Sequence, residues 1–298
     1  MIKVNKILWA TDDSKEARYA LNYSKLFARI FNSEIVGLHV IKVSDKKFWG
    51  LLGERIDLTT WSKDTSDKWF NIFSEVEEEL KKEKLKFNYR VVTGSPHEKI
   101  IEIANEEKAD LIVMGKRGLG LKDRILVGSN TVKVLQRSEI PVLAVKRKGE
   151  KSLPRIKKIL VPFDVSEKFD SALRYAYSLG KTFDATVLVL YVLELISYPY
   201  EFPLHILNEM RNVYDKELKD KIAETTSQEG NKIKIKHKVM ESINSYLGII
   251  GFAENEKVDL IVMNTHGRKG IKRLALGSVA EKVIQEAPCS ILALKPTK

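Results

Sequence analysis

Short apolar runs alternate with amphipathic stretches along this chain, and the alternation predicts strands followed by helices. Residues 6–10 (KILWA) form one apolar run, and residues 110–114 (DLIVM) form another that is apolar nearly throughout, as expected of a strand buried on both faces. After Ser14, a suitable N-cap, apolar positions lie near one helical face at Ala17, Ala20, Leu21, Leu26, Phe27 and Ile30. Strands that alternate with helices predict right-handed crossovers and a mostly parallel, doubly wound α/β sheet.

The other apolar runs of the first half complete this pattern. Strands are predicted at residues 34–43, 86–92 and 141–146, and helices at residues 95–107 and 128–137. The first of these helices begins with a serine and a proline, which suit the N-cap and the first helical position. Together the runs give the first half five strands.

Residues 46–86 form a longer connection that contains three of the four tryptophans, Trp49, Trp61 and Trp69. From Asp67 onward the pattern predicts an amphipathic helix, whereas the part before it is neither a clean helix nor a strand. Two interpretations stay open. The segment is a lid or a docking surface for a partner or a membrane interface, or it is an elaborated crossover that packs on its own domain or on the sister domain.

The whole pattern occurs twice. Residues 6–40 align without a gap on residues 158–192, and residues 110–146 align on residues 259–295. A repeat of about 150 residues indicates duplicated domains rather than a solenoid. We therefore predict a first domain at residues 1–147, a linker at 148–156 and a second domain at 157–298.

Composition adds limits on location and partners. The 298 residues show no signal-peptide pattern and no apolar run of about 18 residues, and Cys289 is the only cysteine, which together predict a cytoplasmic protein without a transmembrane segment. The net charge of +11 admits attraction to an anion, but the lysines are spread along the chain among glutamates, as on a well-solvated surface. No motif typical of nucleic-acid binding is present in the sequence.

The loop at residues 115–128 is the main candidate for a binding site. In a doubly wound sheet, ligands bind beyond the carboxyl ends of the strands, where this loop begins. Gly115 keeps a Cβ away from a ligand, Gly118 allows a turn with positive φ, and Gly128 and Ser129 open a helix whose free N–H groups favour an anion. Further donors and positive charges in or beside the loop come from Lys116, Arg117, Lys122, Arg124, Ser129 and Thr131.

These features predict a phosphate cradle, and the alternative is a charged connecting loop whose glycines provide flexibility. The repetition of Gly118, Arg124, Gly128 and Ser129 as Gly267, Arg273, Gly277 and Ser278 favours the cradle. The sequence contains neither a P-loop nor a dinucleotide fingerprint.

On these residues the chain resembles the universal stress protein family. Gly115-x2-Gly118-x9-Gly128-Ser129 matches the signature of its ATP-binding members, KILWATDDS and KILVPFDVS resemble its first strand and turn, and GSVAEKVIQEAPCSILALK resembles its last helix and strand. The resemblance covers essentially the whole chain, twice. It implies two tandem five-stranded, Rossmann-like domains of the adenine-nucleotide α-hydrolase-like type, with ATP bound in a crevice.

The resemblance also implies roles for individual residues. Ala10, Thr11 and Asp12 would lie at the nucleoside, Val40 would back the adenine, Met114 and Gly115 would follow the ribose, and Gly118, Gly128, Ser129, Asn130 and Thr131 would hold the phosphates, which would in turn hold most of any Mg²⁺. The last strands of the two halves, residues 141–146 and 290–295, would pair with each other, and two chains would be able to form a homodimer.

The second copy departs from the signature. Asn264 replaces the first glycine, and its side chain would occupy space where the ribose passes, although asparagine tolerates positive φ. Phe163 replaces the counterpart of Thr11. The second site is therefore expected to bind ATP more weakly or not at all. It would comprise Pro162, Asp164, Val192, Gly267, Gly277, Ser278 and Val279.

Other candidate residues have ordinary interpretations beside functional ones. Asp12 and Asp164 are either helix-entry or nucleoside-contact acids, which we favour, or a general base or Mg²⁺ ligand. His266 lies where it would touch phosphate, but no catalytic partner is evident. The remaining histidines, His39, His97, His205 and His237, lack metal-ligand spacing and are expected to be ordinary strand or surface residues, and Cys289 is expected to be buried.

The sequence thus predicts a tandem, ATP-binding universal stress protein that acts as a nucleotide-dependent sensor or regulator through ATP, ADP and a protein partner. Hydrolysis is expected to be slow or absent, because a P-loop lysine, a metal-holding acid pair and a water-orienting residue are not recognisable. One alternative is an ATP-hydrolysing or nucleotidyl-transferring enzyme. Another is a nucleotide-free scaffold for a protein partner.

Overall fold

The computed structural model describes residues 2–42, 58–117, 127–147, 153–163, 169–195, 204–227, 233–265 and 276–295. The chain divides into two compact units. The N-terminal unit is Lys3–Ile140, and the C-terminal unit is Pro141–Lys298 together with Met1–Ile2. This division falls before the last predicted strand of the first half, so the domain boundaries expected from the sequence stay a prediction. No helix in the described ranges is both long and apolar enough to span a bilayer.

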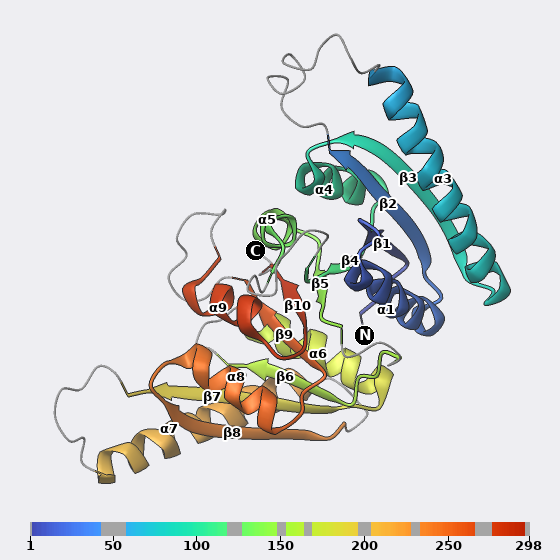
Figure 1. Ribbon diagram of the computed structural model, residues 1–298. Coiled ribbons are helices and arrows are strands. Elements are labelled where there is room, and N and C mark those ends of the chain that lie inside the picture. Colours follow the sequence, from blue (N-terminus) through green and yellow to red (C-terminus); the bar gives the residue numbers. More distant parts are fainter. Residues whose placement is uncertain are drawn as a thin grey trace, which may run out of the picture. The chain divides into compact units, whose positions relative to one another are not determined.

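The N-terminal unit is a parallel sheet in the order β3-β2-β1-β4. Helices α1 and α3 lie on one face of this sheet, and α4 lies on the other face with α5 beside it (Figure 1). Its elements are β1 (Lys6–Ala10), α1 (Lys15–Phe31), β2 (Glu34–Lys42), α3 (Leu58–Lys82), β3 (Lys86–Gly94), α4 (Pro96–Glu106), β4 (Leu111–Gly115) and α5 (Ser129–Arg137).

The C-terminal unit has the strand order β5-β10-β9-β6-β7-β8. Among its described residues the strand pairs are parallel except β5 with β10, which is antiparallel with Leu143 opposite Leu292. The expected pairing of the last strands is therefore confirmed, and Cys289 before β10 is buried as predicted. The elements are β5 (Val142–Val145), β6 (Lys158–Pro162), α6 (Phe169–Phe183), β7 (Thr186–Glu194), α7 (Leu204–Thr226), β8 (Ile235–Ser242), α8 (Ser245–Asn255), β9 (Leu260–Asn264), α9 (Ser278–Glu286) and β10 (Ser290–Leu294).

Helix α1 begins as the sequence predicts, but its buried face differs in two positions. The Ser14 hydroxyl accepts the Ala17 N–H at 3.1 Å and caps the helix. Ile30 is 41% exposed, and Leu26 is only half-buried. Both lie on the far side of the 3.6-residue period from Ala17, so the prediction for them was wrong. The buried residues of α1 are Ala17, Tyr19, Ala20, Leu21, Tyr23, Ser24, Lys25, Phe27 and Ala28.

Helix α3 begins at Leu58, nine residues before the expected start at Asp67. Residues 58–66 are rich in serine and threonine, which are weak helix formers, and this composition concealed the first two turns. Propensity is a weak prior that context overrides. Trp49 lies outside the described residues.

The buried face of α3 packs on β1, β2 and β3 through an aromatic cluster around Phe73. The Phe73 ring is fully buried, and its centroid lies 5.1 Å from that of Tyr89 and 6.1 Å from that of Trp9. Gly37 on β2 makes room for it, because a Cβ there would stand 2.8 Å from Phe73 Cε1. The part of the 46–86 connection that begins at Trp69 therefore packs as a crossover on its own domain.

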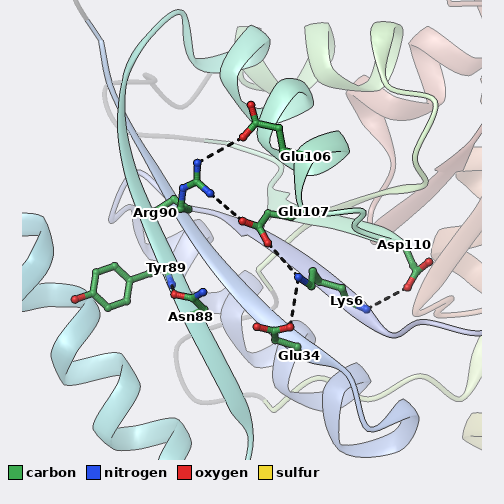
Figure 2. Close-up of polar contacts among 8 residues, drawn as sticks. All are labelled: Lys6, Glu34, Asn88, Tyr89, Arg90, Glu106, Glu107 and Asp110. Carbon is green, nitrogen blue, oxygen red and sulfur yellow. Dashed lines mark hydrogen bonds and ion pairs between the residues drawn. The ribbon is translucent and has the colours of Figure 1, made fainter.

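Ion pairs join the amino edge of the N-terminal sheet to the end of α4 (Figure 2). Glu107, just after α4, bridges Lys6 of β1 and Arg90 of β3, each at 3.0 Å. Lys6 Nζ also lies 3.4 Å from Glu34 on β2, and Arg90 lies 3.5 Å from Glu106. The hydrogen bond to Glu107 raises the pKa of Lys6 above its ordinary value of 10.5, so Lys6 is charged at neutral pH.

The aspartate of each DLIVM run has a structural role that the sequence analysis missed. One carboxylate oxygen of Asp110 accepts the main-chain N–H groups of Asn5 and Lys6, at 2.6 and 3.1 Å. Asp259 accepts those of Lys157 and Lys158 at 2.8 and 3.1 Å. Each aspartate thus fixes the start of the first strand of its repeat, which accounts for its repetition.

Replacing Phe73 with alanine tests the aromatic cluster. We expect the free energy of unfolding to fall by about 3–5 kcal/mol, because the lost ring leaves a cavity in a closed core. Phe70→Ala on the same helix is the matched control, since the Phe70 side chain is 43% exposed. Urea denaturation measures both, and equal losses would contradict the role of Phe73.

Candidate functional site

A cavity with a volume of about 180 Å³ opens at the carboxyl ends of β1, β2 and β4, where they meet the start of α5. All of its lining residues belong to the N-terminal unit. They are Ala10, Thr11, Asp12, Ala17, Leu38, His39, Val40, Pro96, Ile100, Met114, Gly115, Arg117, Gly128, Ser129, Asn130 and Thr131.

The cavity brings together every described residue to which the family resemblance gave a role in the first site, and of the two described loop cations it includes Arg117 but not Lys116. Gly118 lies outside the described residues. Five lining residues were not expected in the site from the sequence: Ala17, Leu38, His39, Pro96 and Ile100. The signal that could have found them is position, since each lies at or just beyond the carboxyl edge of the sheet. Whether the cavity binds a nucleotide stays a prediction.

The wall that α4 and β2 form is apolar, and the end at α5 is polar. The apolar wall contains Leu38, Val40, Pro96, Ile100 and Met114. At the polar end, Gly128 is the N-cap of α5 and provides no side chain to cap it. The first intrahelical bond there is from Val132 N to Gly128 O, at 3.0 Å. The three N–H groups before Val132 therefore lack intrahelical acceptors and favour an anion.

Thr131 does not have the role expected for its hydroxyl. Its Oγ1 is buried and donates to the carbonyl of Gly115 at 3.0 Å, which ties the first turn of α5 to the end of β4. A second bond, from Gly128 N to Lys116 O at 2.9 Å, holds the same junction. Lys116 is buried and lies outside the cavity lining, whereas Arg117 is part of it.

Gly115 is required for packing against α1 rather than for unusual backbone geometry. A Cβ there would stand 2.8 Å from the carbonyl oxygen of Arg117 and 3.0 Å from the amide nitrogen of Ala17. Neither Gly115 nor Asn264 has a positive φ among the described residues. The Asn264 side chain instead accepts the Ser171 hydroxyl of α6 at 3.0 Å. Asn264 is therefore held toward α6 by this bond.

The turn between β1 and α1 holds itself by short-range hydrogen bonds. Thr11 Oγ1 accepts the Asp13 N–H, and Asp12 Oδ1 accepts the Ser14 N–H, both at 3.1 Å. Asp13 has φ of 64°, a left-handed conformation that Asp tolerates. The Asp12 contact is that of a helix-entry acid, the alternative that the sequence favoured. Within the described ranges, no group of three or more His, Cys, Asp or Glu side chains could hold a metal ion.

From the sequence, His39 was expected to be an ordinary strand or surface residue. The structure places it in the cavity instead. It is half-buried, lines the cavity and stacks on Trp69 of α3, with ring centroids 3.4 Å apart and planes 11° apart. Its Nδ1 lies 2.9 Å from the carbonyl oxygen of Thr11. Burial lowers the pKa of His39 from its ordinary value of 6.5, so the ring is neutral at pH 7.

The corresponding place in the C-terminal unit is filled differently. Phe163 is buried and packs edge-on against Tyr191 at 5.8 Å. Val192 is 7% exposed and packs so closely on α8 that a Cβ at Gly248 would be 2.7 Å from it. Phe163 and Val192 correspond to Thr11 and Val40 of the first repeat, and both are buried. Pro162 ends β6, and Gly277, Ser278 and Val279 open α9, whereas Asp164, His266 and Gly267 lie outside the described residues.

A buried histidine connects α4 to α5. His97 Nε2 accepts a hydrogen bond from Arg137 at 3.3 Å, and Nδ1 lies 3.1 Å from the Ser95 hydroxyl. The Ser95 side chain was expected to cap α4, but it makes no capping hydrogen bond. Burial lowers the pKa of His97 from 6.5, and the charges of Lys133 and Arg137 lower it further, against the opposing effect of Glu98. The neutral ring is therefore part of the helix contact.

The lowered pKa predicts acid sensitivity. The unfolded chain binds a proton at this histidine near pH 6.5 and the folded chain only at lower pH, so this contribution to stability is present above about pH 6.5 and is lost as the pH falls through the folded pKa. We expect the fall in unfolding free energy between pH 7.5 and about 5.5 to be smaller in His97→Gln, which keeps an acceptor for Arg137. Denaturation at each pH measures this, and identical pH profiles would refute it.

Gly115→Ala tests the packing requirement at the end of β4. We expect a loss of about 1–3 kcal/mol in unfolding free energy, because main-chain atoms must move to admit the methyl group. Gly251→Ala in α8 is the control, since a Cβ there meets nothing within 4 Å. That control is expected to stabilise the protein by about 0.5–1 kcal/mol. Stabilisation by both substitutions would contradict the analysis of Gly115.

Comparisons with known proteins agree on one family. The model of the universal stress protein family matches residues 3–146 and, a second time, residues 155–295. Two universal stress proteins of Methanocaldococcus jannaschii are similar to this chain. One is 35% identical to it over 145 residues, and the other is 34% identical to it over 159 residues. These matches cover 48% and 50% of this chain and 84% and 98% of the relatives, so each relative corresponds to about half of this chain.

A solved structure matches the chain over both halves. The crystal structure of a universal stress protein from Archaeoglobus fulgidus superposes with a TM-score of 0.71 at 23% identity, and covers 99% of this chain and 100% of that one. The likeness shows the fold, a tandem α/β architecture with mostly parallel strands. With the two family matches and the observed topology, the chain belongs to the universal stress protein family and carries two of its domains in tandem.

Proposed function

We propose that this protein binds ATP in the cavity of its N-terminal unit and acts as a nucleotide-dependent sensor or regulator in a stress response. The observation that carries the proposal is the meeting of an apolar wall and an uncapped helix start in one cavity. The first feature suits an adenine ring, and the second suits a chain of phosphates.

The apolar wall suits a purine base. Leu38 and Val40 come from β2, Pro96 and Ile100 come from α4, and Met114 comes from β4. A flat aromatic base removes apolar surface from water when it lies against such side chains, and a few polar groups then fix its orientation. Thr11 and Asp12 border the wall and provide such groups.

The polar end suits phosphates. The first N–H groups of α5 and the helix dipole favour negative charge, and the Ser129 hydroxyl and the Arg117 side chain line the same end. In this proposal Mg²⁺ is held mainly by the phosphates of ATP.

The C-terminal unit is proposed to bind ATP more weakly or not at all. The Phe163 ring occupies the position of Thr11, and Val192 is more deeply buried than Val40. Occupancy near one equivalent per chain is therefore expected. The proposal extends to a cytoplasmic location, a protein partner that reads the nucleotide state, and homodimer formation.

Nucleotide binding is tested with Ser129→Glu. The new carboxylate lies at the start of α5, where it repels phosphates, so ATP affinity is expected to fall at least about tenfold. The helix dipole stabilises a negative charge at this position, so thermal stability is not expected to fall. Ser278→Glu, at the start of α9, is the matched control and is expected to leave most ATP binding intact. Isothermal titration calorimetry with ATP measures both affinities.

Two results would overturn the proposal. One is the absence of ATP binding by the wild-type protein, at millimolar nucleotide and after gentle purification. The other is release of phosphate or pyrophosphate at about 1 per second or faster, a rate typical of enzymes rather than regulators. A loss of binding in Ser278→Glu equal to that in Ser129→Glu would reverse the ranking of the two units.

A further inference from the structure

Protein contacts hold the His39 ring on two sides. The ring face stacks on Trp69, which is 7% exposed and also packs on Phe73 with ring centroids 5.8 Å apart. The ring edge places Nδ1 2.9 Å from the main-chain oxygen of Thr11. A carbonyl oxygen only accepts hydrogen bonds, so Nδ1 carries the proton and donates. The ring is thus oriented before any ligand arrives.

We propose that His39 is a positioning residue for the nucleoside half of the ATP site. It fixes Thr11 through the Nδ1–H donor, and Trp69 fixes the ring that carries this donor. The inference rests on the proposed function and adds a residue and a role that the family signature does not contain.

The main chain of Thr11 is held by neighbouring residues of β2. The Thr11 N–H donates to the carbonyl of Leu38 at 2.9 Å, and the Thr11 carbonyl accepts from His39. Thr11 is the first residue after β1, and the left-handed Asp13 follows two residues later. Loss of the His39 donor would leave only one of these two main-chain bonds to orient the turn toward the cavity.

A less constrained turn must be ordered when the nucleoside binds, which weakens binding without the loss of any direct contact. A net hydrogen-bond contribution of about 0.5–1.5 kcal/mol corresponds to a change of roughly 2- to 10-fold in the dissociation constant. Because the turn lies at the nucleoside and not at α5, adenosine and ATP should lose affinity by the same factor.

The C-terminal unit shows that the stack and the donor can be separated. Tyr191 of β7 stands in the place of His39 and stacks on Tyr214 of α7, with centroids 4.2 Å apart. The aromatic contact between the second strand and the following long helix is therefore present in both units. A tyrosine has no nitrogen donor at the position of Nδ1. The imidazole donor is a feature of the N-terminal unit, where the open cavity lies.

Two substitutions separate the contributions of the stack and the donor. His39→Phe keeps an aromatic face for Trp69 and removes the donor to Thr11. His39→Asn keeps an N–H group near the position of Nδ1 and removes the stack. We expect His39→Phe to weaken ATP and adenosine equally, by roughly 2- to 10-fold. His39→Asn should stay closer to the wild-type affinity for both while its melting temperature falls.

Calorimetric titration with ATP and with adenosine provides the readout, and Ser129→Glu is the contrasting variant because it should weaken ATP far more than adenosine. Unchanged affinities in His39→Phe, or a loss confined to ATP, would overturn the inference alone. Failure of the wild-type protein to bind either ligand would overturn the proposed function and this inference with it.

A measurement on the wild-type protein does not depend on how well the variants fold. Nitrogen-15 spectra of the histidine side chains at about pH 8, above the ordinary histidine pKa, should show His39 as the neutral tautomer with its proton on Nδ1. The Nε2–H tautomer at His39 would remove the donor and refute the inference.

Discussion

The close approach of the end of β4 to the start of α1 is the constraint on which the cavity depends. At Gly115 the main chain comes so near the first turn of α1 that a single methyl group would meet the amide nitrogen of Ala17 at 3.0 Å. The carbonyl of the same residue accepts the Thr131 hydroxyl and so positions the first turn of α5. One glycine therefore sets the distance between the turn after β1 and the helix start that faces it.

The elements were predictable because they depend on local periodicity, and the errors concern which apolar residues of a helix are buried and where a helix begins. Leu26 and Ile30 were assigned to the buried face of α1 because they are apolar, although the helical period turns them away from the sheet. The early start of α3 was concealed by serine and threonine, whose weak helix propensity does not prevent a helix that the fold requires.

Site residues show the same division. Gly128 and Ser129 could be assigned from sequence because a helix start after a parallel strand has a fixed relation to the edge of the sheet. The acceptor of the Thr131 hydroxyl and the stacking of His39 on Trp69 could not be, because each depends on how two segments distant in the chain meet. Asp110 was read as the start of an apolar run, whereas its carboxylate serves the first strand of the repeat.

The pairing of β5 with β10 has a consequence for how the protein responds to its own abundance. The chain itself joins these two strands, so their encounter is governed by tether length and not by bulk protein concentration. Dilution that would separate two single-domain subunits leaves this strand pair intact. The covalent link thus makes the pairing of β5 with β10 independent of the protein's concentration.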